Sequence, residues 1–177
     1  MTACVEVCPF EATVQDQRSV GVIGDDEIIH RASFDPMHVH PKKGTLKNSF
    51  IKGVDLLKGE LSVWRQSEAS KCSANDIADI IATPDGNSLW GLHGASAAAI
   101  RSLISPDDHR RLFCVVDETE TNDQGGHHPA HAHIRFCQHQ LAKIEDTSSD
   151  LFIHAREQLI QLLSKSGLGW ARPNPTN

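Results

Sequence analysis

The chain has 177 residues, of which 39% are hydrophobic and 23% charged, and its formal net charge is -6 at pH 7. This length suits one domain with one core, and the acidic balance argues against a broadly basic surface for nucleic acid. The chain has no apolar run near the roughly 20 residues of a membrane-spanning helix, and no basic and apolar leader at its N-terminus. We therefore expect a cytoplasmic protein that makes no membrane contact.

Strands are expected in the first part of the chain, where β-branched and aromatic residues gather in short runs at 27–32, 46–51 and 60–65. Residues 35–44 contain two prolines and a glycine, which predicts a loop rather than a regular element. This loop carries His38 and His40.

The middle of the chain changes to a helical period. Ser73 or Asn75 can cap a helix at 75–82, whose apolar stripe consists of isoleucines. An alanine-rich run predicts a second helix at 95–104. The continuous apolar run at 111–116 is typical of a central strand.

An acidic loop over 117–126 leads into a strand at 131–136, and apolar residues at helical spacing predict a last helix at 149–165. Helices and strands alternate with short connections and without repeats. The sequence therefore predicts a single α+β domain over residues 1–170, with a mostly antiparallel sheet, about three helices covering one face and a flexible tail at 171–177.

The densest group of reactive side chains is the histidine-rich run, where four of the eleven histidines fall within seven positions, 127–133. On a strand, His131, His133 and Arg135 would share one face, and the apolar residues between them would share the other. We expect these three to be the catalytic candidates, with His131 or His133 as metal ligand or general acid and base, and Arg135 as an anion-binding group.

A metal site is a second expectation from the histidines. His38 and His40, together with His131 and His133, could supply the three or four nitrogen ligands that zinc or another divalent ion prefers. A carboxylate partner could come from the acidic loop, at Asp117, Glu118 or Asp123. The simpler alternative is that these histidines are surface or structural groups without a ligand.

The cysteines predict thiols rather than a disulfide framework, because five is an odd number and no secretory signal is present. Cys4 and Cys8, followed by Pro9, look like the last cysteines of a bacterial ferredoxin half-motif, but the remaining ligands of that motif are missing. Cys114 lies in an apolar run and is expected to be a small buried hydrophobic residue.

Several short motifs follow one another along the chain, namely His30-Arg31-Ala32, His38-Val39-His40-Pro41, Asn48-Ser49-Phe50, Leu61-Ser62-Val63 and Pro129-Ala130-His131-Ala132. Their order over about 27–136 resembles a family of short uncharacterised bacterial proteins. In that family a Ser-Ala-Phe-like segment stands where this chain has Asn-Ser-Phe, and the second histidine pair is extra here. The resemblance implies no mechanism.

Four catalytic patterns were compared with the chain. The JAMM metalloprotease motif is similar to residues 38–41 with Ser49, but Lys52 stands where its aspartate should follow. Pro129 removes one histidine of a histidine-triad hydrolase, and both histidine pairs lack the hydroxyl residue of a 2H phosphoesterase. ADP-ribosyltransferase-like folds have an early His or Arg, a Ser on a middle strand and a late acidic residue. In this chain the same order is matched by His30-Arg31, by Ser49 or Ser62, and by Glu118.

Two functions remain open from the sequence. The first is a histidine-site enzyme that acts on a small phosphate-containing or amide-containing molecule, and the second is a non-catalytic accessory or protein-interaction domain that docks through a sheet edge or a helix face. The absence of a complete catalytic motif favours the non-catalytic domain, whereas the density of histidines favours the enzyme.

Overall fold

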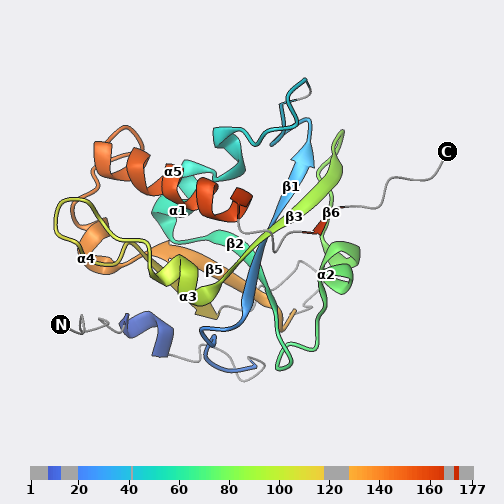
Figure 1. The fold of residues 1–177 in the computed structure, drawn as a ribbon, viewed down its shortest axis with the longest axis horizontal. Helices are drawn as coiled ribbons and strands as arrows, with labels where there is room; N and C mark the ends of the chain where they lie inside the picture. The colour runs from blue at the N-terminus through green and yellow to red at the C-terminus, as the bar shows by residue number, and fades with distance from the viewer. Residues whose placement is uncertain (1–7, 13–19, 41, 118–127, 166–169, 172–177) are drawn as a thin grey trace.

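The computed structural model describes residues 8–12, 20–40, 42–117, 128–165 and 170–171 (Figure 1). A six-stranded sheet in the order β4-β5-β2-β1-β3-β6 forms its centre, and every pair of neighbouring strands is antiparallel. The strands are β1 (Ile28–Asp35), β2 (Leu61–Gln66), β3 (Ser88–Ser96), β4 (Phe113–Asp117), β5 (His131–Phe136) and β6 (Trp170–Ala171). The expected α+β class with a mostly antiparallel sheet is confirmed.

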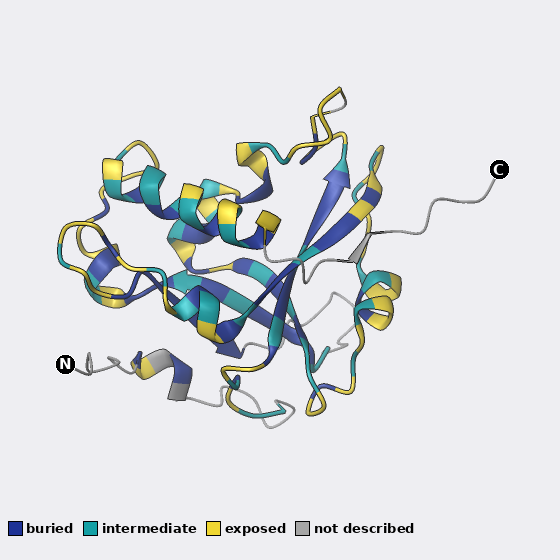
Figure 2. Cartoon of the chain, in the orientation of Figure 1, coloured by how far each residue is buried: buried dark blue, intermediate teal, exposed yellow. Residues whose placement is uncertain are grey.

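The main core lies on one face of the sheet, under the helices α1 (Gly53–Lys58), α3 (Ala97–Arg101) and α5 (Asp150–Lys165). Alternate residues of the strands point into this core, where Leu61 and Val63 of β2 pack with Ala132, Ile134 and Phe136 of β5. Figure 2 shows the buried side of α5 facing these strands. Apolar burial on this face is the main force that holds the sheet and helices together.

The opposite face has a smaller apolar cluster under α2 (Ala74–Ile80), where Ile77 packs against Ala32, Phe34, Leu89 and Leu92. Figure 1 shows α2 on the other side of the sheet from α1 and α5. The prediction that all three helices cover one face is therefore wrong for α2. The reason is that β1 is buried on both faces, so that its alternate residues enter two clusters.

Most predicted elements differ from the observed ones by one to three residues at their ends, and two differ in a more instructive way. Residues 46–51 are not a strand: they contain a 3-10 helix, η2 (Asn48–Phe50), because Phe50 and Ile51 are both buried and a short apolar run can serve a turn as well as a strand. The alanine-rich helix covers only Ala97–Arg101 rather than 95–104. It starts at Ala97 because pairing with β1 extends β3 to Ser96, whose Oγ then caps α3.

The remaining helices are η1 (Pro9–Ala12) and α4 (Gln138–Leu141). At the C-terminal end, Ala171 pairs with Gly91 of β3 and so belongs to the sheet, while the rest of the expected tail lies outside the described residues. None of the helices in the described ranges is long and apolar enough to cross a membrane.

A buried ion-pair network crosses the main-core face. Arg65 is fully buried and its guanidinium binds the carboxylates of Glu27, at 2.8 Å, and Asp117. Burial acts to raise the pKa of Glu27, but hydrogen bonds from Arg65 and from the backbone N–H of Gly24 outweigh it, and the pKa is lowered. Arg65 therefore favours the charged form of Glu27 inside the fold.

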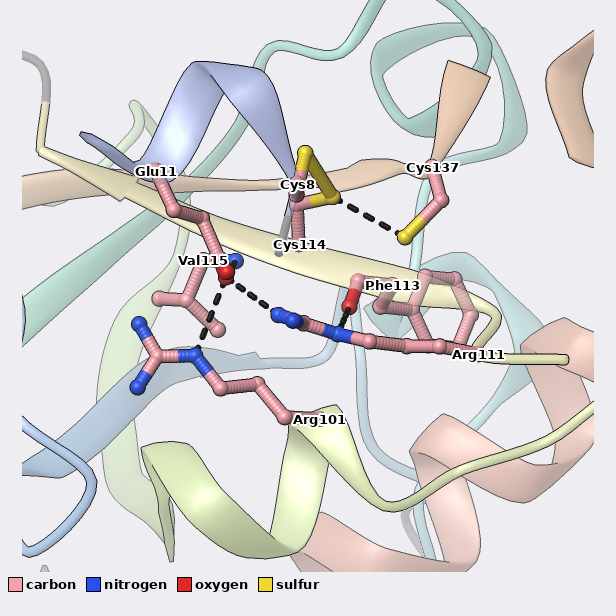
Figure 3. Close-up of a disulfide and its surroundings, with 8 residues drawn as sticks. All are labelled: Cys8, Glu11, Arg101, Arg111, Phe113, Cys114, Val115 and Cys137. Carbon is pink, nitrogen blue, oxygen red and sulfur yellow. Dashed lines mark hydrogen bonds and ion pairs between the residues drawn. A yellow bond between two sulfur atoms is a disulfide. The ribbon is translucent and has the colours of Figure 1, made fainter. Parts of the chain in front are cut away.

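The N-terminal η1 lies along β4, the edge strand of the sheet. Glu11 Oε1 accepts the backbone N–H of Val115 at 2.7 Å, and the same oxygen binds Arg101 at 3.0 Å and Arg111 (Figure 3). A single buried carboxylate thus fixes η1 to both the sheet edge and the end of α3.

Candidate functional site

The histidine-rich strand has the expected bounds and the expected two faces. Ala132, Ile134 and Phe136 enter the main core, so His131, His133 and Arg135 project from the opposite face. The adjacent strand β2 pairs Ser62 with His133 and Trp64 with His131. Two strands thus place a hydroxyl, an indole and two imidazoles on one surface.

Ser62 and His131 form a close polar contact on this face. Ser62 Oγ lies 2.7 Å from His131 Nε2, which is a hydrogen-bond distance. His131 is fully buried and Ser62 is partly exposed. The serine is therefore the more exposed residue of the pair.

Aromatic rings hold His131 in place. The ring of His133 is perpendicular to it at a centroid distance of 4.8 Å, and the ring of Trp64 packs edge-on at 5.3 Å. Trp64 also contacts His128 at 5.2 Å, and burial lowers the pKa of His128. These contacts limit the imidazole of His131 to a narrow range of orientations.

His30 continues the row onto β1, where it pairs with Trp64. Its Nε2 lies 2.7 Å from Gln66 Oε1, and burial lowers its pKa despite this hydrogen bond. A neutral imidazole is thus favoured at the inner end of the surface.

Arg135 lies at the opposite end of the same row, beside Gly59. Gly59 ends α1 in the left-handed conformation, and a Cβ atom built on it would lie 2.8 Å from both Nε and Nη2 of Arg135. Glycine suits this position, because it adopts the positive φ at little cost and because an added Cβ would force the Arg135 side chain to shift.

The structure does not bring His38 and His40 into this row. The His38 ring packs between Phe34, at 5.6 Å, and Phe50, a main-core residue at 6.1 Å, while His40 is exposed. Burial, helped by the positive charges of Arg31 and Lys47, lowers the pKa of His38 to about 4. Its Nδ1 accepts the backbone N–H of Phe34 at 3.3 Å, which gives it a structural role at the end of β1.

The predicted four-histidine metal set is therefore not assembled. Among the described residues, the group whose ligand atoms lie close enough for one ion consists of Cys8, Cys114 and Cys137, within 4.8 Å of one another. Asp117, one expected carboxylate partner, is held by Arg65 on the main-core face. The other expected carboxylates, Glu118 and Asp123, lie outside the described residues.

A second serine-histidine pair lies on the main-core side, where Ser33 Oγ is 2.9 Å from His93 Nε2. Ser33 is fully buried, and burial lowers the pKa of His93 to about 4. Trp90 has no partner in the register between β1 and β3, because it lies at a β-bulge. Its indole stacks on the His93 ring with the ring centroids 5.7 Å apart. This pair closely resembles Ser62–His131 in chemistry but has no accessible hydroxyl.

The cysteines depart from the expectation of thiols. Cys8 and Cys114 form a disulfide with a Cα–Cα distance of 6.3 Å, while Cys137 keeps its sulfur as a thiol 2.9 Å from Cys114 Sγ (Figure 3). The prediction was wrong because folding joins positions 106 residues apart, which spacing along the chain does not reveal. The disulfide also withholds two of the three sulfurs from a metal.

The hydrogen bond between Ser62 and His131 was not predicted from the sequence. The alternation of apolar and polar residues in Leu61-Ser62-Val63 is enough to place Ser62 away from the core. Only the pairing of β2 with β5 brings it to the histidine.

Comparison of the chain with protein-family models, curated proteins and solved structures found no significant match.

Proposed function

We propose that the protein is a hydrolase or transferase in which Ser62 is the nucleophile and His131 the general base, acting on a small amide-containing or phosphate-containing molecule. The observation that carries this proposal is the 2.7 Å separation of Ser62 Oγ and His131 Nε2. A serine hydroxyl is a weak nucleophile until a neighbouring base takes its proton, and imidazole is the usual base.

The surroundings of the pair support the assignment of roles. Trp64 and His133 constrain the ring of His131, and a base that is already oriented needs no reorganisation when it takes the proton. Ser62 is partly exposed, on the face of β2 that points away from the main core, which leaves it open to a substrate. Arg135, on the same face of β5, supplies a cation for a phosphate or a carboxylate group.

A fluorophosphonate probe, which reacts covalently with base-activated serines, tests the proposal. We expect the probe to label Ser62 and expect the labelling rate to fall by at least about 100-fold in Ser62→Ala and His131→Gln, as is typical when general-base catalysis is lost. Peptide mapping identifies the labelled residue, and circular dichroism shows whether each variant is folded.

Ser33→Ala is the matched control, because Ser33 also binds a histidine but is buried. This variant should keep the labelling rate of the wild type. If the wild type is not labelled, or if Ser62→Ala is labelled as fast as the wild type, the pair is a structural hydrogen bond. The non-catalytic interaction domain then becomes the better description.

The ligand role of His131 and His133 needs a separate measurement. Metal content is determined on protein purified without a histidine tag, for the wild type and for His133→Ala. Equal and negligible metal in both supports acid-base chemistry, whereas an ion that is present in the wild type and lost in the variant assigns His133 as a ligand of a metal enzyme.

A further inference from the structure

The structure assigns Cys8, Cys114 and Cys137 to a thiol–disulfide exchange site, in which Cys137 displaces Cys8 from its disulfide with Cys114. This site is separate from the Ser62–His131 pair and does not depend on the function proposed above. The juxtaposition that carries the inference is a disulfide with a third cysteine sulfur 2.9 Å from one of its two sulfur atoms.

The exchange step balances without an external oxidant. The Cys137 thiol loses its proton to solvent, and the thiolate attacks Cys114 Sγ. The bond between Cys114 and Cys137 forms as the bond between Cys8 and Cys114 breaks, and Cys8 leaves as a thiolate that takes up a proton. The number of thiols and disulfides is unchanged, so the two pairings are isomers.

The fold positions all three sulfurs on separate elements. Cys114 is on the edge strand β4, Cys137 directly follows the end of β5, and Cys8 directly precedes η1. All three are buried and form a small cluster with Val116. Within the described ranges, each of these sulfurs has the other two as its near reaction partners.

A cavity of about 420 Å³ adjoins the cluster, and its lining includes Cys8, Cys137, Arg110 and His139. It gives the displaced Cys8 a space to occupy and gives a low-molecular-weight thiol or disulfide a route to the site. A neighbouring cation favours the thiolate over the thiol, and Arg110 supplies a positive charge to this cavity.

Glu11 makes the exchange compatible with the folded state. Three residues after Cys8, its carboxylate binds Val115, Arg101 and Arg111, so η1 stays on the sheet edge when Cys8 is released (Figure 3). Cys8 therefore remains beside Cys114, and the reverse reaction stays intramolecular.

The test is a map of the disulfides in the folded wild type. The protein is held at about pH 8.5, where thiols ionise, then quenched in acid, unfolded, alkylated and digested for mass spectrometry. We expect two linked peptides, Cys8–Cys114 and Cys114–Cys137, in a constant ratio at long incubation times. Linkage at Cys8–Cys114 alone would overturn the inference.

Two variants and one internal reference complete the experiment. Cys137→Ser should contain only the Cys8–Cys114 link, and Cys8→Ser should contain only the Cys114–Cys137 link. Cys72 lies outside the cluster, so its absence from linked peptides shows that exchange took place in the folded chain. Thiols at both remaining positions in Cys8→Ser, under the oxidation that closes the wild-type disulfide, would also overturn the inference.

Discussion

Gly59 lies so close to Arg135 that a Cβ atom at position 59 would be 2.8 Å from the guanidinium and 3.2 Å from Arg135 Cβ. The turn between α1 and β2 therefore determines where the cation at the end of the histidine row can lie.

Gly59→Ala should destabilise the fold more than Gly86→Ala. Both glycines have a similar positive φ, of 76° and 72°, but Gly86 has no atom within 4 Å of the added Cβ. Backbone strain is common to the two variants, so the extra cost of about 1–3 kcal/mol in Gly59→Ala measures the contact with Arg135. Urea unfolding of both variants gives the difference, and equal costs would show that Arg135 moves aside freely.

Arg65→Met should be among the most damaging single changes in the chain. It leaves the carboxylates of Glu27 and Asp117 buried without their cation, which costs roughly 3–5 kcal/mol. The control is Lys52→Met, which removes an ion pair with Asp55 whose lysine side chain is 65% exposed, and which should cost under about 1 kcal/mol. Similar unfolding midpoints for the two variants would contradict this account.

Acidification should destabilise the protein through His38. Its pKa is about 4 in the folded chain and about 6.5 when unfolded, so between these values the unfolded chain binds the proton that the folded chain rejects. Stability is therefore lost as the pH falls from about 6.5 towards 4, and His38 accounts for about 2–3 kcal/mol of the loss.

The measurement is the free energy of unfolding at both ends of that pH range. His38→Gln should show a smaller loss than the wild type, whereas His40→Gln, which changes an exposed side chain in the same loop, should behave like the wild type. An unchanged pH dependence in His38→Gln would place the acid sensitivity elsewhere, for instance at His93, whose pKa is lowered by burial in the same direction.

Glu11→Gln should cost about 2–3 kcal/mol, because it replaces a buried charged acceptor of two arginines. Asp25→Asn is a matched control, since Asp25 binds the same Arg101 with a side chain that is 76% exposed, and its loss should cost under about 1 kcal/mol. Hydrogen exchange at the Val115 amide should accelerate in the first variant only.

Much of the fold could be predicted where a strong period coincides with burial. The alternation at 131–136 gave β5 its bounds, and the apolar spacing of α5 gave a helix that differs from expectation by one residue. Residues 46–51 could not be assigned in this way, because six residues with buried Phe50 and Ile51 fit a strand or a turn equally well.

Only part of the candidate site could be predicted from the sequence. Local alternation predicted that His131, His133 and Arg135 share a face, and the same rule applied to β2 would place Ser62 opposite the core. Their meeting depends on the pairing of β2 with β5, 69 residues apart, and the separation of His38 from them depends on the path of the loop after β1. Such long-range contacts are set by packing of the whole chain.

The attachment of η1 has a consequence for contacts between molecules. An edge strand presents backbone groups that can pair with a strand from another chain and so start aggregation. Glu11 occupies the outward amide of Val115, and the disulfide from Cys8 to Cys114 keeps η1 across that edge. The N-terminal segment thus covers the edge of β4 and prevents strand pairing between molecules. If the segment detached, the exposed edge would favour polymerisation, and the rate would rise with protein concentration.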